Sequence, residues 1–354
     1  MTSDTPGLEE ADRQQPSSAD WASIAGHQRL LLGEEPSLAL AQLAQQAGTD
    51  EETAKSFWRA MGFADVDPQE VRFTSNDVAA LRNTLALVGK DPGQGLAMAS
   101  ALELLRAQSY TMDRLVLWQL ETLVVDLGQR LGLDDTQARL AALDEVGDMV
   151  DILSKQLAYV WRRHLASLLS RTDAEVAGRD REEAGPDYYP LIRSLGFVDI
   201  VSFTQRAQGM SKQDLTLMLE DFEHTTRDVV TSRGARVVKT IGDAVMYIAD
   251  DLPTAADVVT ALVDELQGGP EAIRVRASLV HGRVVSRSGD VFGPTVNLAS
   301  RLVDTAEPGG IRMDEATAMA LLDGPVAHLY RVGQCHQVVA KGLGRIVPWS
   351  LERA

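Results

Sequence analysis

Two aspartates stand at positions where their chemistry could matter. Asp199 interrupts the short apolar run 195–201, and Asp243 follows Gly242 between two β-rich runs. A carboxylate inside an apolar strand is costly to bury unless it is paired or binds a cation. An aspartate in a hairpin turn is ordinary turn chemistry. Separately, Asp199 could form a buried salt bridge and Asp243 could be a turn residue; together they suit two hard cations that assist phosphoryl chemistry.

Four polar side chains could complete such a site. Lys239 precedes the Gly-Asp turn, Asp290 lies further along the chain, and Asn297 and Arg301 are four residues apart on one face of a predicted helix. An arginine fork can stabilise charge that develops on a phosphate, and an amide can orient a sugar. Elsewhere the same residues would be a solvated strand lysine, a loop acid and a surface polar pair.

Three segments, taken together, are far more specific than any one of them. They are Phe197-Val-Asp-Ile-Val-Ser-Phe-Thr204, Lys239-Thr-Ile-Gly-Asp243 and Asp290-Val-Phe-Gly-Pro-Thr-Val-Asn-Leu-Ala-Ser-Arg301. In order and separation they resemble the three signatures of the class III adenylyl and guanylyl cyclases. The resemblance covers about residues 190–354, the whole second half of the chain.

The resemblance implies a metal centre. Asp199 and Asp243 match the two metal-binding aspartates of the family, and the carbonyl of Ile200 matches a third ligand. Backbone amides around Phe203 and Thr204 would face the terminal phosphates. Two Mg²⁺ or Mn²⁺ ions in each active site are the cofactors that the family uses.

The resemblance also implies that the substrate is ATP. Lys239 matches a lysine that donates to adenine N1, and Asp290 matches a carboxylate that accepts from the adenine amino group. Guanine presents the opposite pattern, an N1 hydrogen and an O6 acceptor. Guanylyl cyclases accordingly tend to carry glutamate and a small residue at these two positions.

Four further positions match residues that act on the ribose and phosphates. Asn297 and Arg301 match the transition-state residues of the family, and Arg276 and Lys341 match phosphate contacts on a looser alignment. The implied reaction is in-line attack of the ribose 3′-hydroxyl on the α-phosphate, with pyrophosphate leaving. In this family the site lies between two catalytic domains. Because this chain has one copy of each element, a head-to-tail homodimer would build two equivalent sites.

The elements that must position these residues alternate in type after residue 190. Runs 235–241 and 244–249, separated by Gly242 and Asp243, predict a β-hairpin. Ser211 is placed to cap a helix, and a further helix is expected at about 294–304. We therefore expect an α+β catalytic domain over 190–354 with a mixed or antiparallel sheet. The resemblance implies the ferredoxin-like, palm-type arrangement of sheet and helices.

Residues 26–170 are helical in pattern and show no convincing strand. A capping box is expected at 74–77, and longer helices at about 94–109, 111–131 and 134–169. The segments 58–63 and 73–74 resemble the helical N-terminal regulatory domain of some actinobacterial soluble class III cyclases. Residues 1–25 are expected to be a disordered tail, and the charged stretch 171–189 a linker.

The sequence of the first domain does not determine which signal this domain senses. Residues 40–61 have the rhythm of a helix-turn-helix, although their charge suits a helical scaffold better than a DNA groove. A pH signal sensed by His164, or a lipid or small apolar ligand, are alternatives. Two other functions stay open: a catalytically silent nucleotide-binding sensor, and a DNA-binding regulator with a cyclase-like effector domain.

Length, net charge and cysteine content limit the partners and the cellular location that are expected for the protein. The chain has 354 residues, a net charge of -17 and one cysteine, Cys335. The acidic charge disfavours nucleic-acid partners. A single cysteine allows no intrachain disulfide and fits a cytoplasmic location. The first 25 residues are too polar for a signal peptide, and no run approaches the ~20 apolar residues of a spanning helix.

Overall fold

The computed structural model describes residues 24–89, 91, 93–177, 191–268, 272–287 and 289–354. The chain forms two compact units, Met1–Arg179 and Asp180–Ala354. Residues 1–23 of the expected tail and residues 178–189 of the expected linker lie outside the described part. Residues 171–177 of that expected linker continue a helix.

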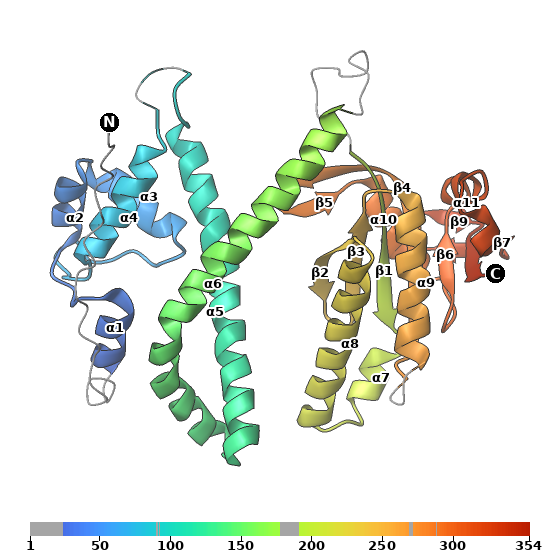
Figure 1. The fold of residues 1–354 in the computed structure, drawn as a ribbon, viewed down its shortest axis with the longest axis horizontal. Helices are drawn as coiled ribbons and strands as arrows, with labels where there is room; N and C mark the ends of the chain where they lie inside the picture. The colour runs from blue at the N-terminus through green and yellow to red at the C-terminus, as the bar shows by residue number, and fades with distance from the viewer. Residues whose placement is uncertain (1–23, 90, 92, 178–190, 269–271, 288) are drawn as a thin grey trace, which may run out of the picture. The chain divides into compact units, whose positions relative to one another are not determined.

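The first unit is helical, as expected. Its described residues contain only two isolated β-bridges, Leu38 with Phe73 and Val88 with Leu96. Its helices are α1 (Ile24–Leu32), α2 (Leu40–Ala47), α3 (Glu51–Ala60), α4 (Ser75–Ala86), α5 (Met98–Leu131) and α6 (Asp135–Ala177) (Figure 1).

The predicted capping box opens α4. Thr74 Oγ1 accepts from the Asp77 N–H, and the Asp77 carboxylate accepts from the Thr74 N–H at 2.8 Å. This pairing satisfies two backbone donors that a helix start would otherwise leave free. The helix then packs Val78 and Leu81 into the core of α2 and α3, which includes Phe57.

The expected break between helices at about residue 110 is wrong, because α5 runs unbroken from Met98 to Leu131. The hydroxyl side chains at this point bond without interrupting the helix. Ser109 Oγ donates to the Met61 carbonyl at 2.5 Å, and Thr111 Oγ1 donates to the Ala107 carbonyl one turn back at 2.8 Å. Back-bonding to the preceding turn lets a serine or threonine sit inside a helix.

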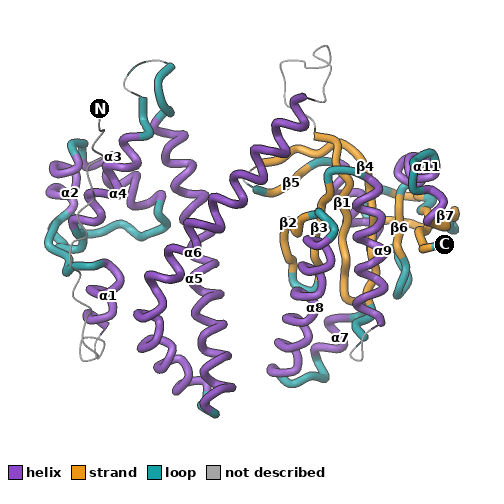
Figure 2. The backbone as a smooth tube through the Cα atoms, viewed as in Figure 1, coloured by secondary structure: helices purple, strands orange, loops and turns teal. Residues whose placement is uncertain are grey.

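The second unit contains every β-strand of the described chain, as Figure 2 shows in orange. The predicted hairpin is present, and Ser211 caps its helix by accepting from the Asp214 N–H. The elements are β1 (Leu191–Ile200), α7 (Phe203–Ala207), α8 (Lys212–Ser232), β2 (Arg236–Ile241), β3 (Ala244–Ala249), α9 (Leu252–Gly268), β4 (Val275–Arg287), β5 (Asp290–Phe292), α10 (Pro294–Val303), β6 (Ile311–Met313), α11 (Glu315–Leu322), β7 (Tyr330–Gln334), β8 (Val338–Ala340), β9 (Gly344–Ile346) and β10 (Trp349–Arg353).

The main sheet has the strand order β2-β3-β1-β4-β6-β10-β7, with β5 paired to β4. The β4–β6 pair is parallel and the other pairs are antiparallel. Strands β8 and β9 form a separate hairpin. The predicted α+β class with a mixed sheet is therefore confirmed.

The two faces of the sheet pack against different helices. Along β1, Val198 and Ile200 join a core with residues of α8, α9 and α11, whereas Leu195 and Phe197 join a core with residues of α10. Helices α8 and α9 lie side by side over the first of these faces (Figure 1). Because side chains alternate along a strand, Asp199 points to the face that carries α10.

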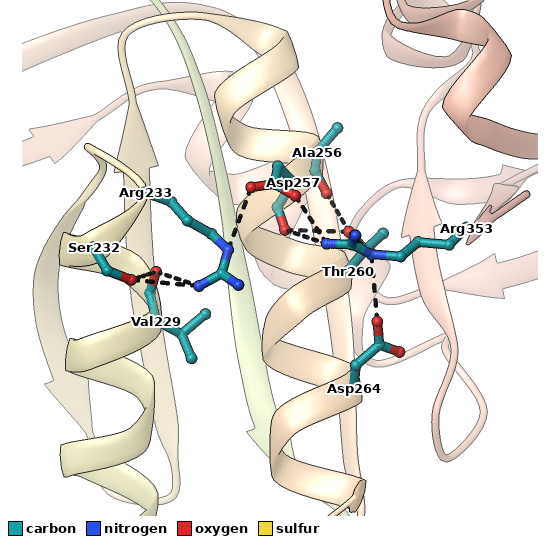
Figure 3. Close-up of polar contacts among 8 residues, drawn as sticks. All are labelled: Val229, Ser232, Arg233, Ala256, Asp257, Thr260, Asp264 and Arg353. Atoms are coloured by element: carbon teal, nitrogen blue, oxygen red, sulfur yellow. Dashed lines mark hydrogen bonds and ion pairs between the residues drawn. The ribbon is translucent and has the colours of Figure 1, made fainter.

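Strand β10 is tied to the helical layer by its terminal arginine. Arg353 donates to the Asp257 carboxylate at 2.8 Å and to Thr260 at 3.2 Å, and it pairs with Asp264 at 3.4 Å (Figure 3). Asp257 also pairs with Arg233, which follows α8, at 3.3 Å. This partly exposed network connects β10 to α9 and to the residue that follows α8.

Candidate active site

The two predicted metal aspartates lie on adjacent, hydrogen-bonded segments of the sheet. Asp199 lies near the end of β1, directly opposite Ala244 on β3, and Asp243 occupies the turn before β3. The Ile200 N–H donates to the Asp243 carbonyl at 3.1 Å, so the backbone itself joins the end of β1 to the turn. The Gly-Asp turn thus fixes Asp243 beside Asp199.

The buried position of Asp199 makes the ionised form of its carboxyl group costly. It is only 9% exposed, and its burial raises the pKa of its carboxyl. Hydrogen bonding and charge from Arg276 lower that pKa, while the nearby Asp243 charge raises it. The Asp243 charge makes the ionised form of Asp199 more costly, and a cation bound beside the two carboxylates would offset that cost.

Arg276 faces Asp199 across the β1–β4 pair. Its Nε donates to Asp199 Oδ2 at 2.7 Å, and its terminal Nη2 approaches the same oxygen at 2.6 Å. The guanidinium also reaches the last turn of α10, where it contacts Asp304 Oδ1 and the Asp304 carbonyl, each at 3.3 Å. The predicted phosphate contact is therefore an ion pair with a metal aspartate in this structure.

Lys239 and Asp290 form the second group. Lys239 Nζ donates to Asp290 Oδ2 at 2.5 Å, across the end of the β4–β5 ribbon. The Phe292 ring lies under the same ammonium, with its centroid 5.9 Å from Nζ. An open hollow of about 800 Å³, lined by Val285, Ser286, Arg287, Phe292 and Gly293, lies at this ribbon. A single protomer therefore assembles the pair predicted to read the base.

The two groups share a face of the sheet. Lys239 lies opposite Met246, which packs in the core beneath α10, and cross-strand partners point to the same side. Asp199 points to that side as well. Among the described residues, no hydrogen bond or ion pair joins the metal aspartates to the Lys239–Asp290 pair.

The remaining predicted residues offer groups at the surface. Asn297 is exposed and Arg301 is partly buried on α10, and no side-chain partner is seen for either within the described residues. Phe203 and Thr204 are the first residues of α7, where backbone N–H groups have no carbonyl partner in the helix. Lys341 is exposed in the β8–β9 turn.

The donor set suits a hard divalent cation. Within the described ranges, no cluster of three or more histidine, cysteine, aspartate or glutamate side chains could hold a metal. The oxygen donors at the predicted site are the carboxylates of Asp199 and Asp243 and backbone carbonyls such as that of Ile200. Magnesium accepts so few protein oxygens because it retains waters and binds substrate phosphates.

Two residues of the site were not identified from the sequence. No sequence feature of Phe292 indicates that it belongs to the site. Asp304 does have such a feature. A carboxylate at the C-terminal end of a helix opposes the helix dipole. Asp304 caps α10 in this position, and the unfavourable charge could have indicated a buried or partly buried cation such as Arg276.

Comparison with known proteins identifies the second unit as a nucleotidyl cyclase catalytic domain. Residues 193–353 match the family described as "Adenylate and Guanylate cyclase catalytic domain". The chain is 33% identical to an adenylate cyclase of Glutamicibacter nicotianae, over 93% of this chain and 82% of that protein. It is 34% identical to an adenylate cyclase of Streptomyces coelicolor, over 92% of this chain and 88% of that protein.

A solved adenylyl cyclase, CyaB from P. aeruginosa, covers 46% of this chain and 94% of its own, at 19% identity and a TM-score of 0.41. The relatives, which extend over both units, show that the chain belongs to the adenylate and guanylate cyclase family. The Glutamicibacter nicotianae and Streptomyces coelicolor relatives are both named adenylate cyclases, which confirms the enzyme class expected from the sequence. No helix among the described residues is both long and apolar enough to span a membrane.

Proposed function

We propose that this adenylate cyclase converts ATP to 3′,5′-cyclic AMP and pyrophosphate at sites shared by two copies of the chain. The observation that carries the choice of ATP is the Lys239–Asp290 pair, held at 2.5 Å beside an open hollow. An ammonium donor and a carboxylate acceptor match adenine N1 and its amino group. They oppose the N1 hydrogen and O6 acceptor of guanine.

Asp199, Asp243 and the Ile200 carbonyl would hold two Mg²⁺ or Mn²⁺ ions. Bound there, such ions lower the pKa of a ribose hydroxyl and neutralise phosphate charge. The residues of the chain do the rest by positioning and charge. Phe203 and Thr204 donate backbone N–H groups to the terminal phosphates, and Lys341 adds a positive charge.

Asn297 orients the ribose, and Arg301 donates to the α-phosphate oxygens as charge develops there. Both side chains lie on α10 without a partner in the described structure, so they are free to receive a substrate. Their supply by the opposite protomer explains why no contact joins the two groups of site residues within one chain. A head-to-tail homodimer then contains two equivalent sites.

The test is product identification. Purified full-length protein is incubated with ATP or GTP, and with Mg²⁺ or Mn²⁺, and the product is resolved by chromatography. Cyclic AMP from ATP is expected, with far less cyclic GTP from GTP. Asp199→Ala is expected to abolish turnover while the protein keeps its fold. Absence of any cyclic nucleotide under every condition would instead favour a silent nucleotide-binding sensor.

We further propose that the helical first unit controls this activity in the cytoplasm. A cavity of about 170 Å³ in that unit, lined by Leu40, Trp58, Arg59, Phe73 and neighbouring residues, could admit part of a lipid or a small apolar ligand. His164, on α6, is the candidate for a pH input. Comparison of full-length protein with residues 180–354 across pH, and with His164→Ala, tests this regulation; identical pH profiles for all three would oppose it.

A further inference from the structure

Arg276 connects the metal half of the site to α10. One guanidinium contacts three acceptors: Asp199 Oδ2 at 2.6–2.7 Å, and the carboxylate and carbonyl of Asp304 at 3.3 Å. The three residues come from β1, β4 and the end of α10. The shorter contacts show that the guanidinium lies closer to Asp199 than to Asp304.

This arrangement places a cation of the protein on a proposed metal ligand. Two nitrogens of Arg276 engage the same oxygen of Asp199, so a divalent ion that binds this oxygen must displace them. A buried carboxylate gains from any cation, and the arginine stabilises it before the metal arrives. Metal binding therefore depends on what then holds the displaced guanidinium.

We propose that Asp304 is a positioning residue that retains Arg276 when a divalent cation occupies Asp199. This inference rests on the proposed metal site. Asp304 presents a carboxylate and a carbonyl at the negative end of α10, where a cation is favoured. Once a divalent cation binds Asp199, Asp304 becomes the sole carboxylate partner of the guanidinium. The arginine then stays at the site as a donor for phosphate oxygens.

The exposure of Asp304 makes the proposal testable without loss of the fold. The Asp304 side chain is 55% exposed, whereas that of Asp199 is 12% exposed. Asp304→Asn keeps the size of the side chain and the backbone carbonyl but removes the charge. A matched control is Asp264→Asn, which removes the same charge from an exposed aspartate that pairs with Arg353 away from the site.

The experiment measures Mn²⁺ binding to the nucleotide-free, full-length protein by electron paramagnetic resonance. We expect Asp304→Asn to weaken Mn²⁺ binding by about five-fold, because the displaced arginine loses its charged partner. Arg276→Met should tighten binding, because the competing cation is gone. In the Arg276→Met background, Asp304→Asn should change affinity by less than about two-fold. Asp264→Asn should bind Mn²⁺ like the unmodified protein.

Two outcomes would overturn the proposal. One is an unchanged affinity in Asp304→Asn, and the other is the same loss with and without Arg276, which would mean that Asp304 acts only through its charge. Asp199→Asn separates this result from a failure of the proposed function. If Asp199→Asn binds Mn²⁺ as the unmodified protein does, the metal site itself is wrong; if it loses binding, only the role of Asp304 is at issue.

Discussion

In the proposed site, the choice of substrate depends on two side chains, Lys239 and Asp290. Their contact leaves the ammonium between a carboxylate and the Phe292 ring, so its position is fixed before a base arrives. Preorganised donors and acceptors discriminate strongly, because the wrong base leaves them unpaired. The pair should therefore decide between adenine and guanine.

We expect Lys239→Glu combined with Asp290→Cys to lower the ratio of kcat/KM for ATP over GTP by about ten-fold or more. The substituted glutamate accepts from guanine N1, and the smaller side chain leaves space for O6. Steady-state kinetics with both nucleotides measures the ratio. Arg331→Glu, a charge reversal on β7, serves as the control and should leave the ratio unchanged. An unaltered ratio in the double variant would contradict the assignment.

His281 gives the catalytic unit a pH-dependent stability. Burial lowers the pKa of this imidazole below its ordinary value of 6.5, although Asp314 and Asp251 act in the opposite direction. Its Nδ1 lies 2.8 Å from Ser194 Oγ on the neighbouring strand. Because the unfolded chain takes up the proton more readily, this stabilising contribution is complete above the unfolded pKa and is lost as the pH falls through the lowered one.

We accordingly expect the thermal midpoint of the unmodified protein to fall more than that of His281→Gln between about pH 8 and about pH 5. The glutamine can still bond Ser194 but cannot become charged. Differential scanning fluorimetry at several pH values measures the difference. Equal slopes for the two proteins would show that His281 takes no part.

The predicted site residues all come from short sequence motifs, and contacts between distant segments could not be predicted from them. Asp243 follows a glycine in a hairpin turn, and Lys239 precedes that turn by a few residues, so a short segment defines both. The pairing of Arg276 with Asp304 depends on how β4 meets the end of α10. No local pattern contains that contact, and only the helix-dipole conflict at Asp304 hints at it.

At the scale of elements, the close pairing of the antiparallel strands β1 and β4 depends on a glycine, Gly196, which has no side chain. A Cβ at Gly196 would lie 1.8 Å from the Ser278 carbonyl oxygen and 2.6 Å from the Tyr247 hydroxyl. Tyr247 is fully buried and donates to that same carbonyl at 2.9 Å. The strand that carries Asp199 thus approaches its neighbour more closely than a side chain would allow.

Gly196→Ala is expected to lower the free energy of unfolding by about 3 kcal/mol or more, because the strands must separate around a buried tyrosine. Urea unfolding followed by circular dichroism measures the loss. Gly268→Ala is the matched control, since a Cβ there meets nothing within 4 Å on the exposed end of α9. It should be neutral or stabilise by up to about 1 kcal/mol. A small loss in Gly196→Ala would mean that β1 and β4 can shift at low cost.

Element types were easier to predict than element lengths. Ser211 predicts the start of α8, and Gly242–Asp243 predicts the β2–β3 hairpin, because each acts through nearby backbone groups. The continuity of α5 does not follow from its own sequence. Ser109 bonds to Met61, far earlier in the chain, and this partner appears only after the helices have packed.

At the scale of the whole molecule, the proposed division of the site between two protomers makes a quantitative prediction. Co-expression of inactive Asp199→Asn with inactive Arg301→Ala creates dimers in which one site has both halves intact. Each mixed dimer should therefore have about one half of the activity of the unmodified dimer, because one of its two sites is intact. Activity of the purified mixed dimers, isolated with two different tags, measures the recovery.

Asp199→Asn mixed with Asp243→Asn is the control for this prediction. Both changes affect the metal half of the site, so every site in a mixed dimer keeps one defect. No activity should return. Recovery in neither mixture would mean that each chain builds its site alone.

The position of β10 has a consequence for biosynthesis. This strand is the last of the sheet to leave the ribosome, yet it lies between β6 and β7. Strand β7 is made earlier, but it has no place in the sheet until β10 pairs with it. While the chain is still being translated, the edge of β6 therefore stays open, and a chaperone or a second nascent chain could pair with it. Completion of the catalytic sheet therefore waits for the synthesis of β10.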